Sequence, residues 1–164
     1  MSDVSYHLAQ INIARLLAPL DDPLLADFVA NLDAVNAAAE ASPGYVWRLD
    51  EPAGAVCVFD DDWLIVNMSV WTSVGALTSY VYSAEHRAVL ARRREWFARL
   101  ADATTVLWWV PAGHLPDVAE GERKLRALRA DGPTPAAFTL RATFPPPTGP
   151  ASQAQTPDVE PCTA

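Results

Sequence analysis

Two stretches of the sequence alternate apolar and polar side chains with a period of two, which is the pattern of a half-buried β-strand. The first covers residues 6–14 and the second covers residues 63–71. Each is followed by helical spacing, which begins at Pro23 after the first stretch and at Thr72 or Ser73 after the second. The chain therefore repeats a strand-to-helix unit, and this order limits the folds that it can adopt.

Shorter patterns complete this order. Further strands are expected at 45–49, 55–59, 104–110 and 138–144, and further helices at 84–100 and 116–129. The resulting order β-α-β-β-α-β, with extra helices and one appended strand, is typical of the ferredoxin-like or split βαβ arrangement. The sequence thus predicts an α+β fold, an antiparallel sheet with helices on one face. Because the other face would then be uncovered, we expect a homodimer that forms a dimeric α/β barrel.

The 164 residues divide into one domain and a tail. Residues 145–164 are rich in proline and polar side chains, and such sequence lacks the apolar surface that offsets the entropy of ordering. We therefore expect a disordered Pro-rich tail at 145–164. The remaining residues, 1–144, are enough for one packed core.

Charge and cysteine content exclude several classes of partner. The net charge of −8 argues against binding to nucleic acid or to an anionic membrane surface. The N-terminus does not resemble a signal peptide, and no apolar run reaches the roughly 18 residues of a membrane span. The two cysteines, Cys57 and Cys162, do not suggest a structural disulfide. These features favour a cytoplasmic protein.

The second alternating stretch carries an unusual polar set. Asn67, Ser69 and Trp71 share one face of the expected strand, and Gln10 and Asn12 are spaced in the same way on the first strand. An unpartnered buried amide or hydroxyl costs on the order of 1–3 kcal/mol. These side chains must therefore pair within the sheet, meet water or line a ligand cavity. If the two strands are neighbours, Asn12 and Asn67 converge, which favours a cavity.

The expected helix at 84–100 adds ionisable candidates. His86, Arg93 and Trp96 recur at helical spacing and are expected to face the sheet. An inward histidine is either a satisfied core residue or a base. An inward arginine needs an anionic or π partner, which can be a nearby carboxylate or an acidic or phenolic ligand.

Tryptophans are further candidates for residues that line a ligand site. Trp71, Trp96 and Trp108 can stack on a planar ligand through their large rings, although such residues also fill cores. Trp108 and Trp109 are adjacent, so they must point to opposite faces, and one of them can anchor an interface. The three histidines lack metal-ligand spacing, so no metal site is expected. Phosphate-binding and hydrolase motifs are also absent from the sequence.

Several longer motifs match known proteins. At "VNMSVWTS" and "SAEHRAVLARRREWF" the chain resembles the antibiotic-biosynthesis monooxygenase type of dimeric α/β barrel. It resembles more closely an uncharacterised bacterial family allied to that type, through "LAQINIAR", "NMSVW", "EHR…RRREWF", "LWWVPAGH" and "GPTPAAFTL". This resemblance covers about residues 5–144.

The resemblance implies roles for particular residues. In those cofactor-independent monooxygenases an Asn and a Trp four positions later line a cavity between sheet and helices, and Asn67 and Trp71 match them. In a related haem-degrading branch an Asn, a Trp and a helical His act together, for which Asn12, Trp71 and His86 are the nearest matches. The resemblance therefore implies no cofactor, with haem as a minor alternative.

These observations lead to one main hypothesis. The protein is expected to be a small-molecule enzyme that oxidises an aromatic or polyketide-type substrate without a cofactor. Asn12 and Asn67 would donate hydrogen bonds to an enolate or phenolate, Trp71 would stack, Arg93 would favour the anion and His86 would act as base. The alternatives are a non-redox cyclase or isomerase, a haem- or ligand-binding module without turnover, and a structural partner protein.

Overall fold

The computed structural model describes residues 4–52 and 54–148 of the chain. Its sheet is antiparallel and consists of β1 (Tyr6–Leu16), β2 (Tyr45–Arg48), β3 (Leu64–Trp71), β4 (Phe97–Ala98) and β5 (Thr105–Pro111). The helices are α1 (Ala26–Glu40), α2 (Val74–Val81), α3 (Ala84–Trp96) and α4 (Val118–Asp131), with a short 3-10 turn, η1 (Pro23–Leu25), before α1.

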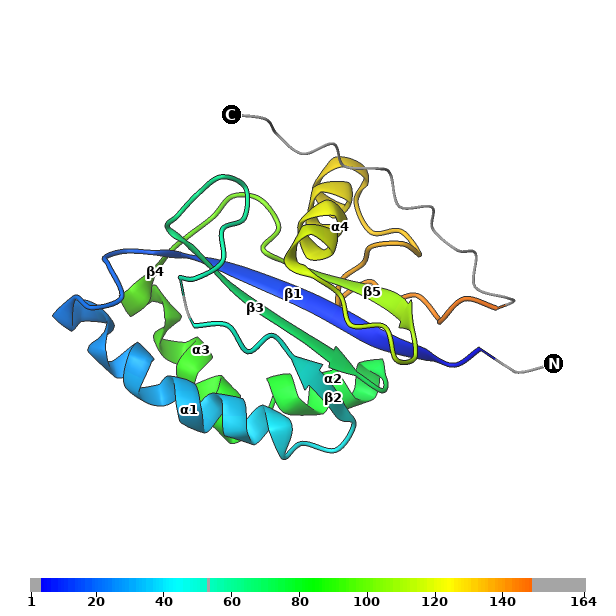
Figure 1. The fold of residues 1–164 in the computed structure, drawn as a ribbon, viewed down its shortest axis with the longest axis horizontal. Coiled ribbons are helices and arrows are strands. Elements are labelled where there is room, and N and C mark those ends of the chain that lie inside the picture. Colours follow the sequence, from blue (N-terminus) through cyan, green and yellow to red (C-terminus); the bar gives the residue numbers. More distant parts are fainter. Residues whose placement is uncertain (1–3, 53, 149–164) are drawn as a thin grey trace.

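Strand β1 lies at the centre of the sheet. One of its edges pairs with β3, from Leu8 opposite Trp71 to Arg15 opposite Leu64. Its other edge is shared by β5 and the short β4, while β2 pairs with the free side of β3. The order β2–β3–β1–β5 is that of a ferredoxin-like sheet, so the predicted α+β fold class is confirmed (Figure 1).

Side chains at the helix ends explain where three helices begin. Ser73, Ser83 and Asp117 each accept a hydrogen bond from a main-chain N–H in the first turn of α2, α3 and α4. Gly132 ends α4 with a φ of 71°, a conformation that glycine adopts without strain. The cap at Ser73 is one of the two helix starts that the sequence predicts after the second strand.

The helices do not all cover the same face of the sheet. Helices α1, α2 and α3 lie on one side, and α4 lies on the opposite side (Figure 1). We call these sides the three-helix face and the α4 face. The prediction of helices on one face is therefore wrong for α4. Its buried Gly121 permits the close contact, because a Cβ atom there would lie 2.7 Å from Cδ1 of Ile11.

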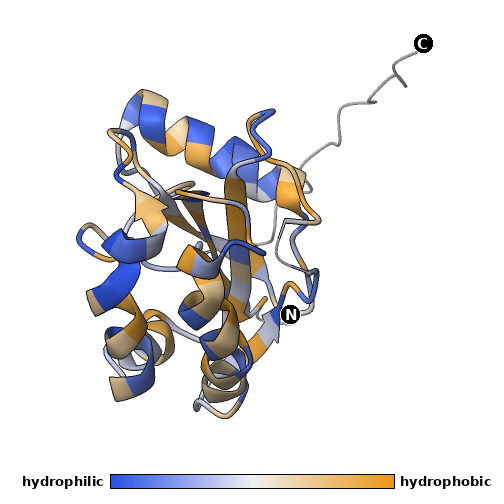
Figure 2. Ribbon diagram, turned by 90° about the vertical axis from the view of Figure 1, so that its left-hand side faces the viewer, coloured by the Kyte–Doolittle hydropathy of each residue, from blue (hydrophilic) through white to orange (hydrophobic). Residues whose placement is uncertain are grey.

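The α4 face is buried by one continuous apolar cluster, the α4 cluster. Its buried members are Ala9, Ile11, Ile13, Val58, Leu64, Met68, Val70, Val106, Trp108, Val110, Leu125, Leu128 and Ala137. Figure 2 shows the hydrophobic strands between α4 and the other helices. The joint barrel is expected because one face of the sheet would otherwise be uncovered. Since α4 covers this face within one chain, that reason is wrong. A homodimer stays a prediction, and it would need a surface other than this one.

The three-helix face carries two smaller apolar clusters. The Trp71 cluster consists of Leu8, Ala39, Trp71, Leu77, Leu107 and Phe138. The Trp96 cluster consists of Leu16, Leu25, Phe28 and Trp96. Each of the three clusters in the described part of the chain thus contains one tryptophan that is 1% exposed or less.

Two predicted strands do not form. At 55–59 the chain turns instead, because Phe59 and Asp60 have left-handed φ values of 53° and 51° that cannot continue an extended strand. At 138–144 the only ladder contact described is the bridge between Phe138 and Leu107, after which residues 139–142 form another turn.

Two further observations concern the predicted tail and the character of the helices. Residues 145–148 are exposed and have no regular structure, and the remainder of the predicted tail, 149–164, lies outside the described residues. Among the helices of the described segments, none has the length and apolar character needed to cross a membrane.

Candidate functional site

Polar side chains cross the three-helix face between the Trp71 and Trp96 clusters. We call them the polar stripe: Gln10, Asn12, Asn67, Ser69 and Thr105. They come from the three central strands. Strand register places Gln10 opposite Ser69, and it places Asn12 opposite both Asn67 and Thr105 on its two neighbouring strands. The predicted convergence of the two asparagines is therefore confirmed by this pairing.

Hydrogen bonds join most of the polar stripe. Gln10 Nε2 donates to Asn67 Oδ1 and to Ser69 Oγ, both at 2.9 Å. Asn12 Nδ2 donates to Thr105 Oγ1 at 2.6 Å. The polar side chains thus pair within the sheet, which is one of the three alternatives that the sequence leaves open.

Asn67 differs from its neighbours because it is exposed. Gln10 and Ser69 are only 7% and 6% exposed, and Met68 is fully buried. The Asn67 carbonyl oxygen is occupied by Gln10, whereas no acceptor for Asn67 Nδ2 is found within residues 4–52 and 54–148. An amide with a fixed oxygen therefore presents a free N–H donor to solvent.

The helices above the polar stripe explain this exposure. The buried residues of α1 are Phe28 and Ala39, which lie near its two ends, and the single buried residue of α3 is Trp96 at its C-terminus. Side chains in the middle of these helices, including Leu32 and Leu90, are only half-buried. Helices α1 and α3 are therefore held to the sheet mainly at their ends.

Trp71 supports the polar stripe from within the core. Its Nε1 donates to Ser69 Oγ at 2.8 Å. Its ring is 0% exposed, stacks on Tyr80 at 5.2 Å between centroids and meets the edge of Tyr45 at 5.7 Å. The ring that was expected to stack on a ligand is thus occupied by two tyrosines.

His86 contacts Tyr80. The two rings are 5.0 Å apart, and His86 Nδ1 lies 3.0 Å from the carbonyl oxygen of Val81. A neutral imidazole that donates from Nδ1 keeps its Nε2 lone pair free. Burial lowers the pKa of His86 and raises the pKa of Tyr80 to about 12. His86 is therefore suited to be a neutral base, and among the described residues its ring contact is with Tyr80.

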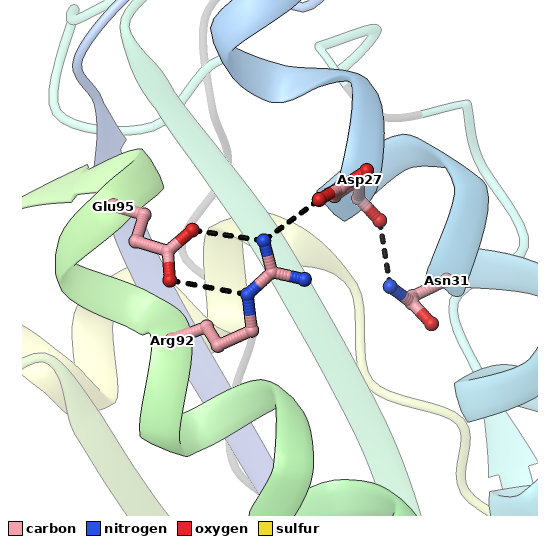
Figure 3. A network of polar contacts seen from close by, with 4 residues as sticks. All are labelled: Asp27, Asn31, Arg92 and Glu95. Carbon is pink, nitrogen blue, oxygen red and sulfur yellow. Dashed lines mark hydrogen bonds and ion pairs between the residues drawn. The ribbon is translucent and has the colours of Figure 1, made fainter.

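The prediction that Arg93 faces the sheet is wrong. Arg93 is exposed, and its neighbour Arg92 instead joins α1 to α3 (Figure 3). Arg92 Nη2 donates to Asp27 at 2.7 Å and to Glu95 at 2.9 Å, and the guanidinium lies 5.0 Å from the centre of the Trp96 ring. The cause is helix rotation, since successive residues differ by about 100° around the axis.

Two of the three tryptophans that are predicted to line the ligand site lie away from the polar stripe. Trp96 is buried in the Trp96 cluster. Trp108 lies on the α4 face, where its Nε1 donates to Glu120 at 2.9 Å, so its assignment to the same site as Gln10 is wrong. The alternation of a strand explains this, because Trp109 then takes the three-helix face. The prediction that Trp108 and Trp109 face opposite sides is confirmed.

Sequence reasoning missed Thr105 and Tyr80. Thr105 begins β5 and can be recognised only from the pairing of β5 with β1. Tyr80 also lines a surface cavity of about 390 Å³, together with Ser42, Pro43, Gly44, Thr72, Gly75, Ala76 and Ser79. A second cavity of about 210 Å³ lies on the α4 face beside Phe59 and Arg129. Neither cavity includes a residue of the polar stripe.

A metal centre is not found in the described part of the chain. In residues 4–52 and 54–148, no three His, Cys, Asp or Glu side chains are grouped so that they could hold a metal ion.

Solved structures with a similar arrangement are distant in sequence. PA3566 from Pseudomonas aeruginosa is 13% identical, with 69% of this chain and 100% of that chain covered and a TM-score of 0.47. The cofactor-independent oxygenase SnoaB from Streptomyces nogalater is 17% identical, with coverages of 71% and 100% and a TM-score of 0.47. Rv0793 from Mycobacterium tuberculosis is 19% identical, with coverages of 68% and 98% and a TM-score of 0.47.

A search of curated proteins finds no match to this chain. The family described as "Domain of unknown function (DUF3291)" matches residues 7–154, which is most of the sequence. The prediction of an uncharacterised family is thereby confirmed, and the chain belongs to the DUF3291 family.

Proposed function

We propose that this protein is a small-molecule enzyme that oxidises a planar aromatic or polyketide-type substrate without a metal or flavin. In this proposal the polar stripe stabilises an enolate or phenolate form of the substrate. The observation that carries the proposal is the exposed amide of Asn67, whose oxygen accepts a hydrogen bond from the buried Gln10.

The physical basis is a donor that is oriented before the reaction begins. An N–H group aimed at a developing negative charge stabilises it without further reorganisation, and loss of one such donor typically lowers the rate by about 10²–10³-fold. Asn12 lies opposite Asn67 on the neighbouring strand, so it extends the same polar surface. A substrate anion that reacts with dioxygen needs this kind of support and no metal ligand.

His86 is the candidate base in this proposal. Its lowered pKa keeps the imidazole neutral near pH 7, and the contact of Nδ1 with Val81 leaves Nε2 available to accept a proton. Arg93, which is exposed on α3, receives no role. The ring of Trp71 also receives none, because Tyr45 and Tyr80 already cover it.

A direct test uses 1,8-dihydroxyanthrone as the probe, a planar phenolic ketone that forms an enolate. Its ring CH₂ group would react with O₂ to give a C=O group and one water, so one oxygen molecule is consumed for each quinone formed. We expect the protein to accelerate both oxygen uptake and the appearance of quinone absorbance. Asn67→Asp keeps the shape and removes the N–H donor, so it should lower the rate by about 10² or more.

The matched control is Asn31→Asp, which adds the same charge on α1, outside the polar stripe. We expect this variant to retain the wild-type rate. Equal rates for Asn67→Asp and the wild type would contradict the proposal. Conversion of the probe without oxygen uptake would replace oxidation by an isomerase or cyclase activity, and a Soret band on titration with haemin that is lost in His86→Ala would favour haem binding instead.

A further inference from the structure

We infer that Gln10 is a positioning residue that holds the Asn67 amide with its nitrogen on the exposed side of the polar stripe. This inference rests on the proposed function of Asn67 as an anion-stabilising donor. Gln10 itself is 7% exposed and is placed to act through Asn67.

The series of bonds starts at Trp71, whose indole N–H can only donate a hydrogen bond. Trp71 Nε1 donates to Ser69 Oγ at 2.8 Å, and the indole cannot turn, since Tyr80 stacks on its face and Tyr45 meets it edge-on. Gln10 Nε2 donates to the same Ser69 oxygen at 2.9 Å. Both lone pairs of the hydroxyl are therefore used, and the amide nitrogen of Gln10 faces β3.

The second N–H of Gln10 Nε2 then determines how Asn67 is oriented. It donates to Asn67 Oδ1 at 2.9 Å, so the oxygen of the Asn67 amide faces Gln10 and its nitrogen faces away. Because Gln10 and Ser69 are almost completely buried, water competes little for the bond between them. An isolated exposed asparagine would have no such preference between its two amide orientations.

The order of bonds Trp71–Ser69–Gln10–Asn67 thus connects a fixed core ring to an exposed donor. It also includes Ser69, whose hydroxyl oxygen accepts hydrogen bonds from both Trp71 and Gln10. Preorganisation of this kind distinguishes a site that binds an anion from a polar surface that binds water equally well in either orientation.

The first experiment observes the orientation itself in the wild-type protein. Side-chain amide signals in a ¹⁵N NMR spectrum are assigned by their loss in Gln10→Glu and in Asn67→Asp. We expect both Gln10 N–H protons to exchange slowly with solvent and both Asn67 N–H protons to exchange rapidly. A slowly exchanging Asn67 proton together with rapidly exchanging Gln10 protons would show the opposite orientation and would overturn the inference.

The second experiment measures the effect on a bound anion, with 4-nitro-1-naphthol as a coloured phenol. Wild-type protein should lower the pKa of the bound probe, whereas Gln10→Met, which keeps Asn67 but loses the N–H groups, should lower it less. A purely structural role of Gln10 would change the free energy of unfolding without changing this pKa. An unchanged pKa in folded Gln10→Met would overturn the inference. If wild-type protein does not lower the pKa at all, the proposed function fails, and the NMR result still decides the orientation.

Discussion

The two faces of the sheet are covered in different ways. One helix, α4, buries the α4 face in a single apolar cluster, whereas three helices leave the three-helix face divided into two clusters with the polar stripe between them. The two faces differ in how closely their helices approach the sheet. Gly121 brings α4 into close contact with Ile11, while α1 contributes buried residues only near its ends. We therefore expect substitutions in the α4 cluster to lower the free energy of unfolding more than substitutions in the middle of α1.

The largest expected effect tests the α4 face. Leu125 is 0% exposed in the α4 cluster, so Leu125→Ala should leave a cavity and lower the free energy of unfolding by about 3 kcal/mol. Urea unfolding at 25 °C measures this value. Leu32→Ala on α1 is the matched control, because Leu32 is only partly buried, and it should cost about 1 kcal/mol. Equal losses would remove the distinction between the two faces.

The next effect concerns how closely α4 approaches the sheet. Gly121→Val would push side-chain atoms into Ile11 and Met68, and such overpacking lowers the free energy of unfolding by about 1–3 kcal/mol. Gly121→Ala should cost less, because the better helix propensity of alanine offsets part of the strain. Thermal unfolding followed by circular dichroism compares the two variants. A wild-type melting temperature for Gly121→Val would show that α4 is free to move outward.

A smaller effect should appear on the three-helix face as a dependence on pH. Burial lowers the pKa of His86 in the folded protein below the ordinary value of 6.5. Below pH 6.5 the unfolded chain binds this proton more readily than the folded protein does, so the free energy of unfolding should fall as the pH falls. Above that pH the contribution is complete and constant. Unfolding measured from pH 5 to pH 8 should therefore show a shallower slope for His86→Gln, and equal slopes would show that His86 is not responsible.

The smallest effect is expected for the ion pairs between α1 and α3. Arg92→Ala removes the bonds to Asp27 and Glu95 and the contact with Trp96 (Figure 3). Because these charges are largely exposed, the loss of stability should be slight and should decrease further in 1 M NaCl. Arg93→Ala is the control, because Arg93 has no ion pair within the described residues. A large and salt-independent loss for Arg92→Ala would mean that the packing of the arginine on Trp96 matters more than its charge.

The sequence predicted the polar stripe better than it predicted the groups around it. A period of two places Gln10 and Asn12 on one face of their strand and Asn67 and Ser69 on one face of theirs. A ferredoxin-like order makes the two strands neighbours. Both properties are local or follow from topology. Side-chain alternation and strand order were therefore enough to bring these four residues together.

The wrong predictions share a different cause, which is that they depend on long-range packing. Helical spacing shows which residues share a face but does not fix how the helix is rotated, and Arg92 rather than Arg93 binds Asp27, which lies 65 positions away in the sequence. In the same way, alternation separates Trp108 from Trp109 but does not say which face a later helix will cover. The position of α4 follows from its fit against Ile11 and not from a local signal.

The distribution of the buried tryptophans makes the three apolar clusters separately observable. Trp108, Trp71 and Trp96 each belong to a different cluster, and all three are shielded from solvent. If tryptophan is replaced by 5-fluorotryptophan, the six tryptophans give six ¹⁹F resonances in one sample, and three of these come from the buried rings of the three clusters. Loosening of the helices around the polar stripe would then broaden or shift the signals of Trp71 and Trp96 while that of Trp108 stays sharp. The molecule thus carries a built-in set of probes that can follow motion in one layer against a stationary reference in the other.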